Sequence, residues 1–389
     1  MAKQDEDFKS FLKKKNVKPL NYFKEKDFAL PVLETGIFSL DVGMGDTDAE
    51  KEHIGIRTRN AMEVVAESNS GKSSLVAQFA KTTIDRFGPQ SVVGLFAEPI
   101  DWYIWQDKGI DIESDEVIVR SAYDPDISIT RNLANSQLED LLDFAKRPEI
   151  KLIFIDSIAA LLPASLVFEK ANQERDLGDP AVAGLAKIYN DFVSKFLLFN
   201  HSCVLCQTNH YRAPIKTKFN PNENQNPDQI YSPGGTVKNY MSRYRVHILA
   251  TKKSMIDSAN ELEGTKNPDT IRQSYRVFKR KQSGTTRTTV AMLSMIDGTY
   301  NNEEKILEYA SFFGTKSKEG VTSRLAIPVA SAGAWYYIGD EKFNGKDNAV
   351  QYLKAQPELT QKIKKALIPF IDECFDKELN TVEEELDNV

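Results

Sequence analysis

A lysine and a serine with phosphate-binding chemistry follow an apolar run early in the chain. The run 61–66 leads into a small polar loop that ends in Gly71-Lys72-Ser73, and an apolar pattern of helical spacing follows. Strand, flexible loop, Gly-Lys-Ser and helix in this order are typical of a phosphate-binding loop. Backbone N–H groups at the helix start can surround an oligophosphate. Lys72 can reach its terminal phosphates, and Ser73 can bind Mg²⁺.

The loop departs from the usual pattern at its first position. The pattern G-x-x-x-x-G-K-[ST] has Gly where this chain has Ala66. Ala is comfortable only at negative φ, so we expect the loop to bend differently at its start. The alternative is an ordinary helix cap, but the strand before and the helix after favour a nucleotide. The residues that we expect to bind the nucleotide are Glu67, Ser68, Asn69, Ser70, Gly71, Lys72, Ser73 and Ser74.

Two carboxylates stand at the ends of later apolar runs. Glu98 follows the run 91–97, and Asp156 follows the run 151–155. Ligands of an open α/β sheet bind beyond the carboxyl ends of its strands. Glu98 can there orient or deprotonate an attacking water, and Asp156 can hold Mg²⁺ together with Ser73. Each has an ordinary alternative, a solvated loop glutamate and a helix N-cap respectively.

An aromatic cluster follows Glu98 directly. It contains Trp102, Tyr103 and Trp105, and Asp101 precedes it. These rings could stack on an adenine or simply cover the edge of the sheet. We take Asp101 and Tyr103 as the candidates for contact with the base of the nucleotide.

The composition is that of a globular chain without a general affinity for nucleic acids. The 389 residues predict two or three domains, and 41% of them are hydrophobic. The net charge is −6, from 50 basic and 56 acidic residues. If DNA is a ligand, the positive charge that binds it must therefore be local.

Neither a membrane span nor a disulfide framework is expected. No apolar run reaches about 18 residues, and the first residues contain no apolar signal core. Three cysteines are too few for a disulfide scaffold, which favours a reducing cytosol. Cys203 and Cys206 have the spacing of a redox or metal pair. They lie in an apolar run without a second pair, however, so we expect buried structural thiols.

We expect four parts along the chain. Residues 1–31 begin with a basic amphipathic stretch that docks on this chain or on a neighbour; a frayed terminus is the alternative. Residues 32–299 form the core, and residues 300–375 form a small α-rich domain. Residues 376–389 are an acidic tail, which is solvated or competes with DNA for a basic surface.

Two long polar segments interrupt the core, at 163–183 and 211–233. Such segments in a compact domain are usually functional or disordered. The second carries charges that suit the phosphates of a flexible single strand and rings that suit its bases; a plain solvated loop is the alternative. The candidate DNA-binding residues in these segments and directly after them are Arg175, Arg212, Lys216, Lys218, Phe219, Gly234 and Gly235.

Together these features resemble the RecA family of strand-exchange recombinases, as a divergent phage-type member. The resemblance covers about residues 32–375, most of the chain. The C-terminal part of the match is specific, because other ATPases on this core lack that domain. The matching segments are 35–41 at the entry to the ATPase core, 66–74 at the phosphate loop, 96–98 at the catalytic glutamate, 155–161 at the Mg²⁺-side strand, and 331–337 and 345–349 in the C-terminal domain.

The resemblance implies a fold and a set of roles. The fold is a RecA-like P-loop ATPase core, an α/β structure with a twisted, mostly parallel sheet flanked by helices, plus a short N-terminal helix and a small α-rich C-terminal domain. Glu98 would be the catalytic glutamate, beside Lys72. His210 would sense the γ-phosphate, where most bacterial members have Gln. Lys279 and Lys281 would reach across a subunit interface to the neighbour's ATP.

The function that the resemblance implies is ATP-dependent homologous recombination. The chain would form helical filaments on single-stranded DNA, pair it with homologous double-stranded DNA and exchange strands. DNA-stimulated hydrolysis of ATP with Mg²⁺ would accompany this work in the cytoplasm. A hexameric helicase-type ATPase and a DNA-binding filament protein with weak ATPase activity are the alternatives. A helicase would lack the C-terminal domain, and a measurement of DNA-stimulated hydrolysis identifies the weak ATPase.

Overall fold

The structure is a computed structural model, and it describes residues 14, 15, 17, 18, 20–164, 181–211, 232–235, 237–249, 270–280, 286–294 and 298–375. Among these residues, no helix combines the length and the apolar character that a membrane crossing needs. Cys203 and Cys206 are free thiols, and both are buried as predicted.

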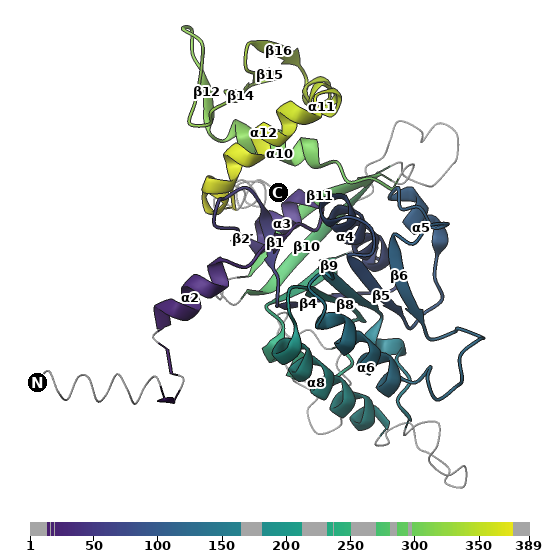
Figure 1. Cartoon of the computed structure of the whole chain (residues 1–389). Helices are drawn as coiled ribbons and strands as arrows, with labels where there is room; N and C mark the ends of the chain where they lie inside the picture. The colour runs from purple at the N-terminus through teal and green to yellow at the C-terminus, as the bar shows by residue number, and fades with distance from the viewer. Residues whose placement is uncertain are drawn as a thin grey trace, which may run out of the picture.

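The centre of the molecule is one large sheet. Its strands are β4 (Ala61–Ala66), β5 (Val92–Phe96), β6 (Val117–Ser121), β7 (Leu152–Asp156), β8 (Val204–His210), β9 (Tyr244–Leu249), β10 (Thr270–Arg280) and β11 (Arg287–Ser294). They lie in the order β11-β10-β9-β4-β8-β7-β5-β6 (Figure 1). The strands from β9 to β6 pair in parallel, and β10 and β11 extend the sheet antiparallel. The predicted α/β fold with a mostly parallel sheet is confirmed.

Helices cover both faces of the parallel part of the sheet (Figure 1). They are α4 (Lys72–Phe87) and α5 (Trp102–Asp107) on one face and α6 (Ala134–Ala145) and α8 (Ala181–Phe199) on the other. Phe79 of α4 belongs to the same apolar cluster as Val64, and Phe196 of α8 belongs to the same cluster as Leu205. Because both faces are covered, β4, β5 and β7 are buried along their whole length, which explains their continuous apolar runs. Two short helices follow β7 and precede β9, η1 (Ile158–Ala160) and α9 (Val237–Met241).

The N-terminal elements lead into this core. They are α2 (Leu20–Phe28), β1 (Val32–Leu33), α3 (Phe38–Met44), β2 (Asp46–Thr47) and β3 (Ile54–Arg57), and the three strands form a small sheet. Helix α2 buries none of its residues and extends away from the core (Figure 1). Leu20 is 85% exposed and Phe23 is 55% exposed. The amphipathic stretch that we expect before α2 lies largely outside the described residues, so its docking role stays a prediction.

The C-terminal elements combine helices with short strands. They are α10 (Asn302–Ser311), β12 (Gly314–Lys316), β13 (Val321–Ser323), β14 (Val329–Ala332), β15 (Trp335–Ile338), β16 (Glu341–Asn344), α11 (Lys346–Ala355), α12 (Pro357–Leu367) and η3 (Ile368–Phe370). Their apolar cluster also includes Phe38 and Val42 of α3. Lys364 Nζ lies 2.8 Å from Glu34 Oε2, which ties α12 to the core. The expected domain boundaries stay a prediction, because this packing is continuous.

Candidate nucleotide-binding and catalytic site

The phosphate loop connects β4 to α4 at the carboxyl end of the sheet. Gly71 precedes the helix with φ +85°, and Asn69 has φ +59°. Glu67, Ser68 and Asn69 are exposed, while Ser70 is buried. The first turn of α4 offers unpaired backbone N–H groups, as a phosphate ligand requires.

Ala66 fits the place where the usual motif has Gly. It is fully buried in β4, where it pairs with His210 of β8 and Ile248 of β9. Its backbone φ is negative, so no left-handed conformation is required there. The Tyr211 N–H donates to its carbonyl oxygen at 3.0 Å. Ala66 therefore continues the sheet up to the first residue of the loop.

Lys72 lies folded over its own loop. Its Nζ donates to the carbonyl oxygen of Glu67 at 2.8 Å and to that of Ala66 at 3.4 Å. Burial lowers the pKa of Lys72, although the nearby carboxylates of Asp156 and Glu98 act in the opposite direction. The ammonium group is thus held by two carbonyl oxygens between the loop and the two carboxylates.

Asp156 and Ser73 form a pair of oxygen ligands at the ends of β7 and of the phosphate loop. Ser73 Oγ donates to Asp156 Oδ2 at 2.8 Å, and Thr208 Oγ1 of β8 donates to Oδ1 at 2.5 Å. Burial raises the pKa of Asp156 despite these two hydrogen bonds. A nearby cation would favour its ionised form.

This oxygen donor set fits Mg²⁺. Mg²⁺ usually takes one or two protein carboxylates and completes its shell with water and substrate phosphates. In the part of the chain that the structure describes, no group of three or more His, Cys, Asp or Glu side chains could hold a metal. Ser73 and Asp156 together therefore suit a magnesium ion that arrives with a nucleotide, rather than one held by a closed protein cage.

Glu98 lies beside this pair and contacts two polar side chains. Ser157 Oγ donates to Glu98 Oε1, and His210 Nε2 lies 3.1 Å from the same oxygen. Burial alone would raise the pKa of Glu98, but the hydrogen bonds from Ser157 and His210 and the charge of Lys72 outweigh it. The pKa of Glu98 is therefore lowered, and the carboxylate is ionised at neutral pH.

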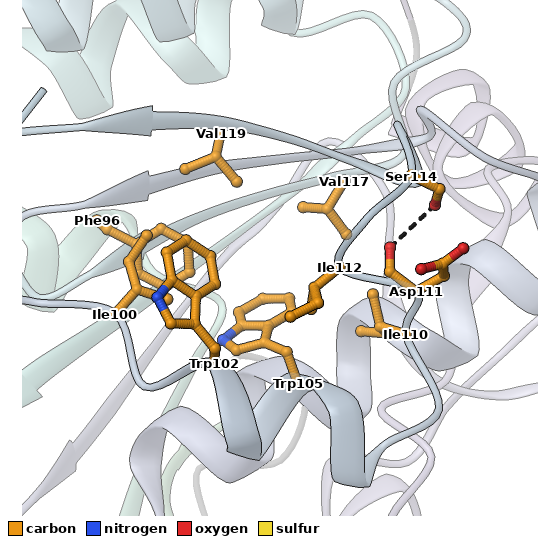
Figure 2. Close-up of a pocket in the computed structure, with 10 residues that line it drawn as sticks. All are labelled: Phe96, Ile100, Trp102, Trp105, Ile110, Asp111, Ile112, Ser114, Val117 and Val119. Carbon is orange, nitrogen blue, oxygen red and sulfur yellow. Dashed lines mark hydrogen bonds between the residues drawn. The ribbon is translucent and has the colours of Figure 1, made fainter.

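The residues after Glu98 fall into two groups, one at the exposed start of α5 and one that lines an apolar pocket. Asp101 caps α5 by accepting a hydrogen bond from the Tyr103 N–H at 3.2 Å, and the Tyr103 side chain is 77% exposed. Trp105 is buried against Phe96. Trp102 and Trp105 instead line an apolar pocket between α5 and the edge strands (Figure 2). Asp101 and Tyr103 do not line that pocket, so they remain separate candidates for contact with a base.

Most of the predicted DNA-binding and interface residues lie outside the described part of the chain. Gly234 and Gly235 have φ of +93° and +79° and approach α8, where a Cβ on Gly235 would lie 3.0 Å from that of Ala186. Lys279 lies in β10, where its backbone alone is described. The predicted residues outside the described part of the chain are Arg175, Arg212, Lys216, Lys218, Phe219 and Lys281.

A buried ionic cluster connects the site to the end of the second polar segment. Glu63 of β4 is fully buried, with Lys238 Nζ at 2.9 Å and Arg245 Nε at 2.6 Å. Ser232 Oγ and Asn209 Nδ2 donate to Glu63 Oε1 at 2.7 and 3.0 Å. Burial would raise the pKa of Glu63, but the charges of Lys238 and Arg245 lower it. The cluster thereby fixes the end of β8 and the chain after residue 231 to the strand that precedes the phosphate loop.

The sequence motifs assign no role to Ser157, Thr208 or Glu63. Ser157 directly follows Asp156, and Thr208 stands two residues before His210, so the strand ends themselves are the signal for both. Glu63 is a lone charge within the apolar run of β4. A charge in such a run is rarely buried without a partner, which is the signal that could have revealed it.

Comparisons with known proteins find similarity along most of the chain. Residues 328–371 match the RecA C-terminal domain family. The chain is 24% identical over 354 residues to Protein RecA of Teredinibacter turnerae, covering 90% of this chain and 87% of that protein. It is 24% identical over 339 residues to Protein RecA of Synechocystis sp., covering 85% and 79%. It is 25% identical over 350 residues to Protein RecA of Acholeplasma laidlawii, covering 87% of each.

Proposed function

We propose that this chain, a divergent member of the RecA family, is an ATP-dependent recombinase that coats single-stranded DNA and exchanges it with a homologous duplex. The observation that carries the proposal is the contact between Ser73 Oγ and Asp156 Oδ2 at 2.8 Å. It joins the helix after the phosphate loop to the end of β7 and leaves both oxygens beside Lys72. A phosphate loop and a Mg²⁺-type carboxylate in this arrangement support the binding of ATP.

Each side chain of the site has a separate role in the proposed hydrolysis of ATP. Lys72 neutralises the terminal phosphates, and the N–H groups of the loop and of α4 bind their oxygens. Ser73 and Asp156 would hold Mg²⁺, which supplies charge neutralisation at the phosphates when bound. Glu98, ionised at neutral pH, orients the attacking water and accepts its proton. His210 contacts the Glu98 carboxylate through Nε2, and in this proposal it would respond to the γ-phosphate.

ATP in this proposal is bound between successive subunits. The phosphate loop of one subunit supplies Lys72, and the next subunit supplies Lys279 and Lys281. Because ATP then binds the assembled state better than the free chain, it favours the filament. The exposed helix α2 is available to dock on the neighbouring subunit.

DNA in this proposal is bound by the two polar segments, mainly through its backbone. Arg212, Lys216 and Lys218 would contact phosphates, and Phe219 would stack on a base. Recognition of sequence is left to base pairing between the strands. Gly234 and Gly235 lie at the C-terminal end of the second segment, beside the Glu63 cluster that reaches the phosphate loop strand. We place this activity in the cytoplasm, where both DNA and ATP are available.

Two measurements on the full chain test the proposal. ATP hydrolysis is measured with and without single-stranded DNA, and electron microscopy is carried out with DNA and a non-hydrolysable ATP analogue. We expect stimulated hydrolysis and helical filaments. Closed rings would favour the helicase alternative, and filaments without hydrolysis would favour the weak ATPase. Single particles that respond to neither ligand would overturn the proposal.

A further inference from the structure

A buried cluster of three side chains contacts the backbone of the phosphate loop from the antiparallel side of the sheet. Gln273 and Tyr275 lie on β10, and Tyr300 follows β11. They are 5%, 0% and 7% exposed. We call these three residues the loop-support cluster. None of them carries a role in the proposed chemistry.

The hydrogen bonds of the cluster fix the orientation of one amide. Gln273 Nε2 donates to the Ser70 carbonyl oxygen at 3.2 Å. Gln273 Oε1 accepts from the Tyr275 hydroxyl at 2.6 Å and from the Tyr300 hydroxyl at 3.2 Å. Burial raises the pKa of both tyrosines, so both hydroxyls keep their protons and remain donors. A carbonyl oxygen only accepts, so the amide nitrogen must face the loop.

The cluster contacts the loop on both sides of Lys72 and Ser73. Gly71 packs so closely on Gln273 that a Cβ at this position would overlap Nε2. Beyond Ser73, the Ser74 side chain lies beside the Tyr300 hydroxyl. The two residues that bind phosphate and metal in the proposed function therefore stand between two residues that lie against one cluster.

We propose that Gln273 is a positioning residue, which holds the Ser70–Gly71 backbone in the conformation that binds phosphate. The inference rests on the proposed function, because it assumes that this loop binds a nucleotide. Gln273 touches no phosphate itself and acts only through the loop. A loop that is ordered before binding loses less conformational entropy when the ligand arrives, so its affinity is higher.

The first test uses Gln273→Met in the full chain. Methionine has a similar shape but offers no N–H donor, so Ser70 loses its partner. We expect the Kd for a fluorescent mant-ATP with Mg²⁺ to rise about tenfold, which corresponds to about 1.4 kcal/mol. Hydrogen–deuterium exchange in residues 67–74 should become faster even without nucleotide. The matched control is Gln137→Met in α6, since Gln137 is 1% exposed and its Nε2 has no hydrogen-bond partner among the described residues.

The second test uses Gln273→Glu and varies the pH. An ionised carboxylate cannot donate to the Ser70 carbonyl oxygen, whereas a protonated carboxyl can. The affinity for mant-ATP, relative to wild type, should therefore recover as the pH falls. Gln137→Glu places the same buried carboxyl away from the loop and should show no such recovery. A role in folding alone would not separate these two variants.

The outcomes distinguish the inference from the proposed function. If the wild-type chain binds no mant-ATP, the proposed function fails and the inference fails with it. If the wild type binds and both Gln273 variants bind equally well at every pH, the inference alone is overturned. Should Gln273→Met fail to fold, Tyr275→Phe removes a single oxygen from the cluster. Unchanged affinity and unchanged exchange in that variant would likewise overturn the inference.

Discussion

Glu98 and His210 meet at the candidate site, with Oε1 3.1 Å from Nε2, although 112 residues separate them in the sequence. Glu98 follows β5, and His210 is the last residue of β8. These two strands are not neighbours in the sheet, because β7 lies between them. The contact therefore passes across the end of β7, where Ser157 also donates to Glu98. The candidate base and the candidate phosphate sensor thus form one hydrogen-bonded unit.

This unit makes the pH dependence of hydrolysis testable. Hydrogen bonds from Ser157 and His210 lower the pKa of Glu98 against the effect of burial. Ser157→Ala removes one of them, so the pKa of Glu98 rises. In the proposed mechanism Glu98 acts in its ionised form, so the acidic limb of the kcat profile should move to higher pH. Steady-state hydrolysis between pH 5 and 8 measures this, with the exposed Ser194→Ala as the control, and an unmoved limb would contradict the assignment of Glu98.

Lys72→Ala tests the phosphate loop. We expect hydrolysis of ATP to fall by about 10²–10³-fold, because the variant loses a charge that neutralises the transition state. Lys81→Ala on the same helix is the control, since Lys81 pairs with Asp85 at the surface. A phosphate-release assay with saturating single-stranded DNA measures both variants. Normal turnover in Lys72→Ala would remove the loop from the mechanism.

A mixing experiment tests the proposed ATP site at the interface between successive subunits, which we call the seam. Lys279→Ala with Lys281→Ala should keep the fold, as circular dichroism can show, and lose about 10²-fold of its DNA-stimulated turnover. Lys316→Ala with Lys318→Ala has the same spacing on a different strand end and should be unaffected. Mixing the Lys279/Lys281 variant with Lys72→Ala should restore part of the activity, because some seams then combine an intact loop with intact lysines. No recovery on mixing would place these lysines within their own subunit.

Stability rests on the buried cluster around Glu63. Lys238→Met leaves one buried carboxylate with fewer partners, and breaking such a pair costs about 3–5 kcal/mol of unfolding free energy. Because the pKa of Glu63 is lowered in the folded chain, its contribution is present above its unfolded pKa and is lost as the pH falls through the folded one. Urea denaturation at neutral pH measures the loss. Adding Glu63→Gln should recover part of it.

A matched surface variant controls this measurement. Lys365 is half exposed and pairs with an exposed Glu52 at 3.4 Å. Exposed pairs are worth about 0–1 kcal/mol, so Lys365→Met should barely shift the midpoint. Equal losses in Lys238→Met and Lys365→Met would show that the Glu63 cluster contributes no more than a surface pair.

The strands that carry the site were predictable because they are buried on both faces. Continuous apolar runs mark β4, β5 and β7, and each ends where a polar side chain becomes available to a ligand. Within the expected α-rich domain, the apolar spacing of residues 346–355 predicts a helix, and α11 coincides with it. The spacing of residues 358–375 predicts one further helix, but α12 ends at Leu367 because Pro369 cannot continue it. The short strands β12–β16 have too few residues to show a period.

The partners of these strands could not be predicted from spacing. Gln273 contacts Ser70, which lies 203 residues earlier in the sequence. The sequence pattern of β10 indicates a buried strand face but not which residue Gln273 contacts. The pairing of β4 with β9 and the register of β10 decide that contact, and both depend on the folded sheet. Likewise, the sequence shows Glu63 as a charge within an apolar run. Its partners Lys238 and Arg245 become evident only when the fold places α9 and β9 beside β4.

The packing of α3 has a consequence for synthesis on the ribosome. Its residue Phe38 belongs to the apolar cluster of the C-terminal elements, and its N–H donates to Asn302, 264 residues later. At about 5–20 residues per second, translation needs roughly 13–50 s to synthesise the chain from Phe38 to the C-terminal elements that pack on it. During this interval the nascent chain presents an uncovered apolar helix, so we expect it to depend on a holding chaperone until its last domain emerges.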